Sequence, residues 1–546
     1  MKKNNIPLDG WAGLRQNMSS DSLSGFLVFL LALPLSLGIA QASDFPAVYG
    51  LVTAMVGGVV VSLLAGSPLT IKGPAAGLIV IVAGAVAELG QGNAELGWKL
   101  ALGAIVVAGF IQILFGVIKL GSFSDFFPLS TVHGMLTAIG IIIMAKQLHV
   151  IAGMNPVTSD GTPMFEPIDL MIELRYTFTH FFEHKDVAII GLISLAIVFG
   201  WPMIPVKSLK KIPSALIVLL VAIPMAGWLG VANVAEIKDA SGAIIQKGFS
   251  PLLSFKQGLT DIIGVRVSFD GFSQTGTFVK YVIMFALVGS LEALLTVKAI
   301  DLLDPYRRRS NTNKDLIALG LGNIIAGVMG GLPMISEVAR SSANVSNGGK
   351  TRWSNFFHGF FILLFLVFAV HFSDIIPKSA LAAMLIGVGW KLAHPREFGH
   401  LAKVGRDHIA IFLATIIITL TTDLLVGIAS GILLKLLLHI ARAVPLRYLF
   451  TPRFETKDDT IRVYEAAIFS NFIPIKRKVL SYTFKSHIKL DFSKCSFIDY
   501  TVMESLHHLK DDFQNEGGSL TIMGIEEFKP VSNHPLATRR KKRSVH

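Results

Sequence analysis

The chain has few charged residues and almost no cysteine. Charged residues are 16% of its 546 residues and hydrophobic residues are 52%, whereas an average soluble domain carries roughly 25% charged residues. This composition excludes an ordinary soluble enzyme and a disordered chain. The single cysteine, Cys495, permits no internal disulfide and no cysteine-based metal site. The sequence also lacks the Gly-x-x-x-x-Gly-Lys loop that cradles phosphates, so it shows no sign of ATP hydrolysis.

Long uncharged stretches are abundant instead. Ser22 to Ser43 and Trp353 to Ser373 contain no Asp, Glu, Lys or Arg, and about 20 apolar residues allow a helix to cross a bilayer. The 50 glycines and 23 prolines fit this class, because transmembrane helices tolerate both residues. We therefore predict an α-helical polytopic membrane protein.

The apolar segments predict fourteen spans, at 22–41, 47–65, 75–88, 98–118, 130–150, 187–204, 212–233, 278–300, 315–330, 336–346, 354–372, 379–391, 407–422 and 424–444. Lys and Arg, Lys72 among them, are more frequent in the loops and span ends assigned to the cytoplasm than on the opposite side. We expect a multi-pass protein of the cytoplasmic (inner) membrane, in contact with its lipids, with both termini cytoplasmic. The net charge of +12 then reflects these loops and not nucleic-acid binding.

The composition changes after about residue 450, where charges return. Thr460 to Phe469, Ser486 to Phe492 and Ser519 to Gly524 have the pattern of strands, and Thr501 to Asn515 has a helical period, which predicts a small α/β domain. The expected organisation is a cytoplasmic N-terminus at 1–21, a transmembrane transporter domain with core and gate parts at 22–445, the α/β domain at 455–530 and a basic, solvated tail at 531–546.

Two short spans each begin with a segment that contains glycine and proline. They are Gly66 to Leu78 (GSPLTIKGPAAGL) and Gly330 to Gly349 (GGLPMISEVARSSANVSNGG). They lead into the third and tenth of the fourteen spans, which is the same place in two halves of seven, and seven is odd. This predicts a 7+7 inverted repeat with two half-helices, whose N-termini face each other near the membrane midplane.

Such a pair of N-termini favours an anion, because unpaired N–H groups and the positive dipole ends point at one place. Arg340 lies about one turn into the tenth span, and a buried cation at membrane depth is a functional candidate. We predict that Arg340 binds the anion opposite the backbone of Ala75, Ala76 and Gly77. The hydroxyls of Ser336 and Ser341 complete the predicted substrate-binding set.

Two intramembrane carboxylates are candidate cation-coupling groups. Glu292 lies in the middle of the eighth span, with Thr296 one turn later on the same face. It can load H⁺, or can ligate Na⁺ together with hydroxyls and carbonyls; the alternative is a hydrogen bond that only ties two helices. Glu337 has either a coupling role or a local salt bridge to Arg340 three residues later.

Several segments resemble the SulP anion transporters, the bacterial relatives of the mammalian solute carrier 26 family. The resemblance covers almost the whole chain, and it is carried by LALPLSLGIA, GSPLTIKGPAAGL, GSLEALLT and GGLPMISEVARSSANVSNGGKTR. The segment HIKLDFSKCSFIDYTVMESLHHL, followed by GGSLTIMGI, resembles the STAS domain of that family.

The resemblance implies a core of spans one to four and eight to eleven that moves against a gate domain in an elevator-like cycle, and a homodimer. It places Ala75, Ala76 and Gly77 at the anion-facing turn, Arg340 at the basic position, and Glu292 and Thr296 at the cation-coupling place. Sodium-coupled relatives often carry Asp where this chain has Glu292, which favours H⁺. Relatives usually carry small residues near Glu337. Asp499-Tyr500-Thr501 replaces the phosphorylatable serine context of related STAS proteins, so the domain is expected to act as a dimer or partner surface.

No nucleophile, metal cage or acid–base pair converges in the sequence, so we predict a transporter that is not an enzyme and needs no cofactor beyond H⁺ or Na⁺. His180, Glu183 and His184 match the His-x-x-Glu-His spacing of zinc proteases but lie in a loop too short for such a site. The predicted function is secondary active transport of an inorganic oxyanion, sulfate or bicarbonate, with H⁺ or Na⁺. The alternatives are a dicarboxylate transporter, an uncoupled anion channel or exchanger, and a membrane scaffold that recruits a soluble partner through its STAS-like domain.

Overall fold

The structure is a computed structural model. It describes residues 6–122, 127–154, 164, 166–206, 212–234, 237–238, 244–246, 250–253, 264–368, 370–442, 444–515 and 517–541. Two compact units are present, Met1–Gly121 with Ile139–Leu392, and Ser122–Ala138 with Ala393–His546.

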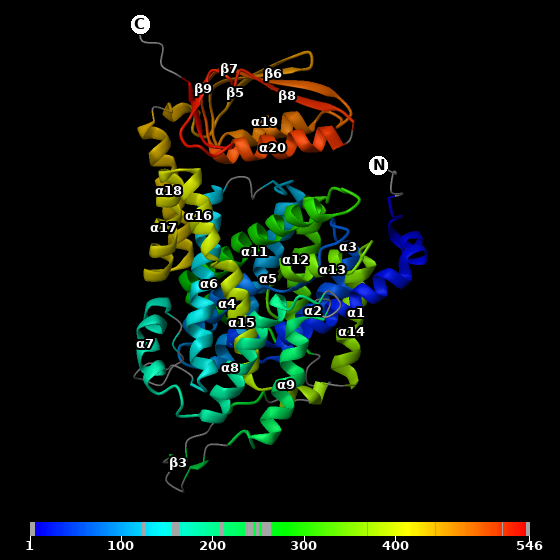
Figure 1. Ribbon diagram of the computed structural model, residues 1–546, viewed down its shortest axis with the longest axis vertical. Helices are drawn as coiled ribbons and strands as arrows, with labels where there is room; N and C mark the ends of the chain where they lie inside the picture. The colour runs from blue at the N-terminus through cyan, green and yellow to red at the C-terminus, as the bar shows by residue number, and fades with distance from the viewer. Residues whose placement is uncertain are drawn as a thin grey trace. The chain divides into compact units, whose positions relative to one another are not determined.

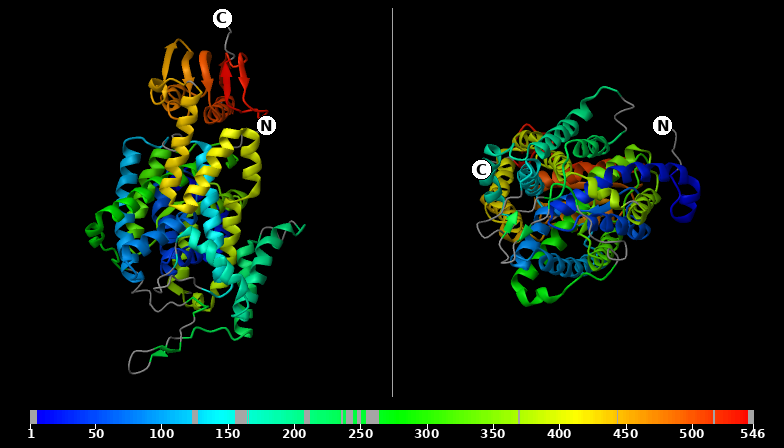
Figure 2. Two further views of the ribbon diagram at one scale, coloured as in Figure 1. Left: turned by 90° about the vertical axis from the view of Figure 1, so that its left-hand side faces the viewer. Right: turned by 90° about the horizontal axis from the view of Figure 1, so that it is seen from below.

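The first unit is a bundle of helices that run side by side (Figures 1 and 2). Its helices are α1 (Gly10–Ala42), α2 (Val48–Val56), α3 (Ser62–Leu64), α4 (Ile79–Gly90), α5 (Ala94–Val117), most of α6 (Leu129–Ile151), α7 (Pro167–Thr179), α8 (Lys185–Gly200), α9 (Ser214–Trp228), α11 (Thr275–Leu303), α12 (Thr312–Val328), α13 (Val338–Ser346), α14 (Trp353–Phe368) and α15 (Lys378–Leu392). Its strands are β1 (Lys72–Pro74), β2 (Ile237–Lys238), β3 (Ile244–Gln246) and β4 (Met334–Ser336).

The described helices confirm the polytopic α-helical class. Six of them are long and apolar enough to cross a membrane, and four shorter apolar helices accompany them. Every predicted span contains a helix, although α1 begins at Gly10 and not near residue 22. The polar residues Asn17 and Asp21 lie within this helix and both are buried, and Asp21 accepts hydrogen bonds from the backbone N–H groups of Lys350 and Thr351.

The two predicted half-helices are each preceded by a short strand. Strand β1 leads through a 3-10 turn at Ala76–Leu78 into α4, and β4 leads into α13. The two strands pair antiparallel, with Lys72 opposite Ser336 and Pro74 opposite Met334. This pairing joins two segments that lie more than 250 residues apart in the chain.

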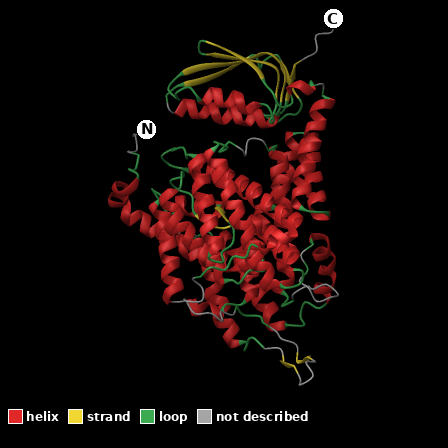
Figure 3. Cartoon of the chain, turned by 180° about the vertical axis from the view of Figure 1, so that it is seen from behind, coloured by secondary structure: helices red, strands yellow, loops and turns green. Residues whose placement is uncertain are grey.

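The second unit combines helices with a sheet. Its helices are the start of α6, then α16 (Pro395–Val404), α17 (Arg406–Thr421), α18 (Leu424–Ala441), α19 (Phe472–Leu480) and α20 (Tyr500–Asn515). Its strands are β5 (Arg453–Lys457), β6 (Thr460–Ala467), β7 (His487–Ile498), β8 (Ser519–Met523), β9 (Phe528–Pro530) and β10 (Arg539–Lys541). The sheet order is β5-β6-β7-β10-β9, and β8 also pairs with β7. Figure 3 shows these strands gathered in one sheet, in contrast to the helical first unit.

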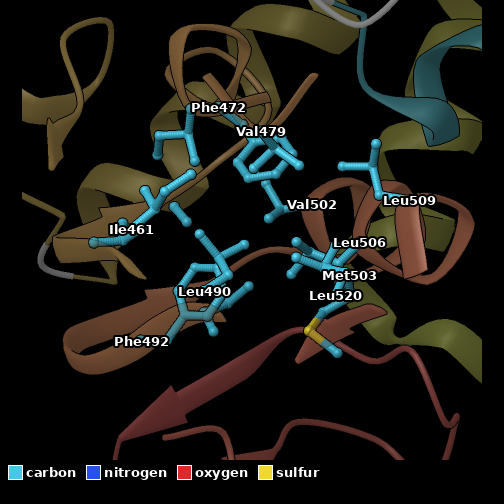
Figure 4. Close-up of a cluster of buried hydrophobic side chains, with 14 of the residues drawn as sticks. Ile461, Phe472, Val479, Leu490, Phe492, Val502, Met503, Leu506, Leu509 and Leu520 are labelled. Atoms are coloured by element: carbon cyan, nitrogen blue, oxygen red, sulfur yellow. The ribbon is translucent and has the colours of Figure 1, made fainter. Parts of the chain in front are cut away.

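The core of the C-terminal α/β region lies between this sheet and its two helices. Ile461, Leu490 and Phe492 project from the strands and are buried against Val502 and Leu506 of α20 (Figure 4). Strands β6, β7 and β8 run parallel, which requires crossover helices, here α19 and α20. The predicted α/β domain is confirmed, and its sheet and helices fit a STAS domain.

Part of the predicted basic tail is a strand, although the side chain of Arg540 is exposed and those of Arg539 and Lys541 are half-buried. Arg539 to Lys541 form β10, which pairs with both β7 and β9. Lys541 Nζ also donates to the carbonyl oxygen of Ser493 at 2.7 Å. The basic residues therefore complete the sheet through their backbones; Lys542 and Arg543 lie outside the described residues.

Candidate functional site

The ladder between β1 and β4 places the two half-helices. Beyond the strand pairs, Ala75 N donates to Pro333 O at 3.2 Å, and Glu337 N donates to Ile71 O at 3.0 Å. Because the strands are antiparallel, the chain leaves the ladder in opposite directions. Helices α4 and α13 therefore begin on opposite sides of one point, and both N-termini contribute partial positive charge there.

Arg340 lies in the first turn of α13 and has no hydrogen-bond partner for its guanidinium in the described part of the chain. Its side chain is 0% exposed, and its three guanidinium nitrogens have no hydrogen-bond partner among the described residues. The side chain packs so closely on β1 that a Cβ atom on Gly73 would collide with Nη1. A buried guanidinium with five free N–H donors is suited to a planar or tetrahedral oxyanion.

Glu292 of α11 reaches the other half-helix. A Cβ atom on Gly77 would collide with both carboxylate oxygens of Glu292, so the carboxylate lies directly against the backbone of the predicted anion-facing turn. Glu292 is buried and its Oε2 has no hydrogen-bond partner within the described chain. Thr296 is buried one turn later. The structure therefore brings the predicted coupling residue to the predicted anion site.

Glu337 is the carboxylate that lies beside Arg340. Its Oε2 lies 4.0 Å from Arg340 Nε. The contact with Arg340 is too long for a hydrogen bond, and Glu337 Oε2 has no such partner in the part of the chain described. The local salt bridge is thus a weak one, and it leaves Arg340 with unused donors.

The two predicted serine ligands are engaged within the protein. Ser336 Oγ accepts a hydrogen bond from Lys72 Nζ at 2.6 Å. Ser341 Oγ accepts from Ile71 N at 2.9 Å and donates to Glu337 O at 2.6 Å. Both hydroxyls tie the two half-helices together in this structure. Ala75, Ala76 and Gly77 are buried, and of these three the carboxylate of Glu292 lies against Gly77.

The prediction that Lys72 belongs to the cytoplasmic loops and span ends is wrong. The residue lies in β1, is 0% exposed, and pairs with Asp315 Oδ2 of α12 at 2.7 Å. Asp315 Oδ1 accepts from Gly66 N and Ser67 N, each at 3.1 Å. This pair neutralises Lys72, so among the residues that the structure describes near the ladder, Arg340 is the cation without a hydrogen-bond partner. A lysine inside the GSPLTIKGPAAGL motif is the signal that sequence reasoning missed.

Side-chain amides form hydrogen bonds to the backbones of β1 and β4. Asn323 Oδ1 accepts from Met334 N at 2.6 Å, and Asn323 Nδ2 donates to Gln112 Oε1 at 2.7 Å. Asn355 Oδ1 accepts from Lys72 N at 3.4 Å. These bonds satisfy backbone groups that the three-residue strands leave open inside the bundle, so the ladder is held from α12, α5 and α14.

The zinc-protease spacing has no structural counterpart. His180, Glu183 and His184 belong to the turn after α7 and not to one helix, and His180 stacks on Tyr176 with ring centroids 4.0 Å apart. Among the residues that the structure describes, no group of three His, Cys, Asp or Glu is placed to hold a metal ion.

The fold and this site define an integral membrane protein with paired half-helices around a buried arginine. Residues 18–415 match the model of the sulfate permease family, and the chain belongs to that family, whose members are anion transporters.

The relatives support the same assignment. The putative sulfate transporter YvdB of Bacillus subtilis (strain 168) is 25% identical over 527 residues, which are 94% of this chain and 92% of that protein. The bicarbonate transporter BicA of Picosynechococcus sp. is 25% identical over 456 residues, 82% of this chain and 75% of that protein.

Two solved structures share the fold. The transmembrane domain of a cyanobacterial BicA has a TM-score of 0.62 at 22% identity, over 76% of this chain and 98% of that chain. The structure of SLC26A9 has a TM-score of 0.66 at 17% identity, over 94% of this chain and 85% of that chain.

Proposed function

We propose that the protein is a secondary active transporter of an inorganic oxyanion, sulfate or bicarbonate, driven by H⁺ or Na⁺. The observation that carries this proposal is the buried Arg340 guanidinium in the first turn of α13, which packs on β1 at Gly73 and has no hydrogen-bond partner in the described residues. A buried charge without a partner is costly, and an oxyanion supplies the missing acceptors. The names of the relatives, sulfate and bicarbonate transporters, support the choice of cargo.

The charges around the ladder favour coupling to a cation. Lys72 and Asp315 cancel each other. Arg340, Glu337 and Glu292 together carry one net negative charge when both carboxyls are ionised, so the empty site repels an anion. A cation at Glu292 removes this repulsion, and by linkage the anion also favours the cation. This reciprocity is what a symporter requires, and a glutamate without a hydrogen bond at Oε2 suits H⁺ as that cation.

The remaining parts of the proposal come from the family. We propose an elevator-like movement of the core against the gate, a homodimer, and an inner-membrane location with both termini cytoplasmic. Residues 22–445 would form the transport domain, and residues 455–530 the STAS domain that offers a surface to the second subunit or to a soluble partner.

The test is uptake into proteoliposomes of labelled sulfate and, in parallel, labelled bicarbonate under an imposed H⁺ or Na⁺ gradient. Wild type is expected to accumulate one anion with one gradient. Arg340→Ala removes hydrogen bonds to a charged group, each worth about 1.5–3 kcal/mol, so uptake at low anion concentration should fall about tenfold to a hundredfold. Replacement of the exposed Arg15 by Ala is the matched control and should leave uptake unchanged.

Glu292→Gln separates coupling from binding. The variant should bind the anion but no longer accumulate it against its gradient, whereas an uncoupled channel would tolerate the change. If wild type accumulates neither anion under either gradient, the proposal of an inorganic symporter fails. Dicarboxylates are then the next cargo to measure, and an activity that survives Arg340→Ala would favour a scaffold.

A further inference from the structure

His358 of α14 is a buried imidazole with no assigned task. It is 0% exposed, and neither ring nitrogen has a hydrogen-bond partner among the described residues. Another buried histidine of the first unit, His149, bonds through both nitrogens, to Thr177 Oγ1 at 2.5 Å and to Leu170 O at 3.0 Å. Buried polar groups are normally satisfied, so an imidazole without partners calls for a ligand.

His358 lies beside the anion site. On the same face of α14, three residues earlier, Asn355 bonds to the backbone of β1 at Lys72, and the next residue of β1, Gly73, touches Arg340 Nη1. The face of α14 that carries Asn355 and His358 is therefore turned toward β1 and Arg340.

Helix α1 contacts both α13 and α14. Ser24 Oγ donates to Asn344 Oδ1 at 2.7 Å, one turn after Arg340 on α13. Its neighbour Gly25 packs on α14, where a Cβ atom would crowd His358 N. Adjacent residues of α1 thus contact α13 one turn beyond Arg340 and the backbone of α14 at His358, so these parts of α13 and α14 lie at one level along α1.

We propose that His358 is a second side-chain ligand of the cargo and a specificity residue that selects oxyanions over halides. This inference rests on the proposed function and adds a residue to its site. Arg340 supplies a planar fork of donors to one edge of an oxyanion. A neutral imidazole offers one N–H donor and one acceptor nitrogen, so it can bind a further oxygen of sulfate or the hydroxyl of bicarbonate. A spherical halide has no second oxygen for it.

The experiment uses the full-length protein in proteoliposomes. The variants are His358→Leu and His358→Phe, which remove both ring nitrogens, and His358→Gln, which keeps a donor and an acceptor. For each, the KM and maximal rate of oxyanion uptake are measured, together with its inhibition by chloride. The expected result is an oxyanion KM at least tenfold higher in the Leu and Phe variants, a chloride inhibition constant within twofold of wild type, and recovery to within threefold in the Gln variant.

His149→Gln is the matched control for the loss of a buried histidine, and it should leave the ratio of oxyanion to chloride affinity unchanged. An unchanged ratio in the Leu and Phe variants would overturn the role of His358, even if Arg340→Ala abolishes uptake and so upholds the proposed function. Wild-type protein that transports neither anion would overturn both.

A measurement on wild type keeps the inference testable if the Leu and Phe variants do not fold. With ¹⁵N-labelled histidine, sulfate should shift one ring-nitrogen resonance that is missing from the His358→Gln protein, whereas chloride should not. The absence of any sulfate-dependent shift at that resonance, in protein that transports sulfate, would contradict direct contact.

Discussion

At the scale of single residues, Gly77 leaves space for the side chain of Glu292. The carboxylate occupies the volume that a Cβ atom at residue 77 would need. A glycine at this position therefore brings the candidate coupling group against the backbone that is predicted to face the anion. In the proposed symporter, a cation at Glu292 would act directly on the anion, because both would bind at the start of one half-helix.

Gly77→Ala should consequently displace the Glu292 carboxylate and reduce gradient-driven uptake about tenfold or more, since a misplacement of about 1 Å can cost a hundredfold in rate. Glu292→Asp shortens the side chain by one methylene, so the Gly77→Ala/Glu292→Asp double variant should transport better than Gly77→Ala alone. The control is Gly276→Ala, because a Cβ atom at residue 276 meets nothing within 4 Å. A double variant no better than the single one would show that the two residues do not compete for this space.

Most residues of the candidate site could be predicted, because each has a signal in its own segment of the sequence. Glycine and proline mark the half-helix starts, and Arg340, Glu337 and Glu292 are charges inside apolar segments, so each carries its own signal. Lys72 was misplaced because its partner, Asp315, lies 243 residues away. Without that partner, a lysine near the end of an apolar segment has the pattern of a residue that reaches for the membrane surface.

At the scale of elements, β1 and β4 pair with each other where two uninterrupted helices would form hydrogen bonds within themselves. Each strand has three residues, which is too short for a strand pattern to be recognised in sequence. The ladder also depends on bonds from other elements, such as Asn323 to Met334. The sequence therefore predicted the two half-helices but not the strands that precede them.

The Lys72–Asp315 ion pair joins β1 to α12. We expect the effects of replacing its two residues on the free energy of unfolding to be non-additive. Lys72→Met leaves a buried carboxylate without its cation, which costs about 3–5 kcal/mol. The Lys72→Met/Asp315→Asn double variant should be less destabilised than Lys72→Met, because the amide oxygen can still accept from Gly66 N and Ser67 N. Thermal unfolding in detergent measures both.

Lys99→Met is the control for this comparison, since the Lys99–Glu95 pair is solvent-exposed and exposed pairs add little. Its melting temperature should match that of wild type. A double variant that melts at or below the temperature of Lys72→Met would mean that the two residues stabilise the protein independently of each other.

At the scale of the whole molecule, the tryptophans and the cysteine lie in different parts of the chain. The tryptophans are Trp11, Trp98, Trp201, Trp228, Trp353 and Trp390. The single cysteine, Cys495, belongs to the C-terminal sheet. Its Sγ lies 3.3 Å from Phe497 O, and burial raises the pKa of the thiol to about 12. The chain therefore carries separate probes for its membrane helices and for its α/β domain.

The native thiol should be inert. At pH 8 a group with a pKa of about 12 is ionised to about one part in ten thousand, and the thiolate is the reactive form. Maleimide should therefore label Cys495 only when the α/β domain unfolds. In a urea titration of the detergent-solubilised protein, labelling should appear at a lower urea concentration than the change in tryptophan fluorescence. The physical reason is that detergent holds the apolar helices together while the sheet, whose core faces two amphipathic helices, is exposed to denaturant.

Coincident transitions of the two probes would instead show that the chain unfolds as one cooperative unit, and the proposed boundary between residues 445 and 455 would then not separate independent domains. Rapid labelling without urea would contradict the burial of the thiol itself. Cys495→Ser supplies the blank for labelling, and its tryptophan transition should coincide with that of wild type because all six tryptophans precede residue 391.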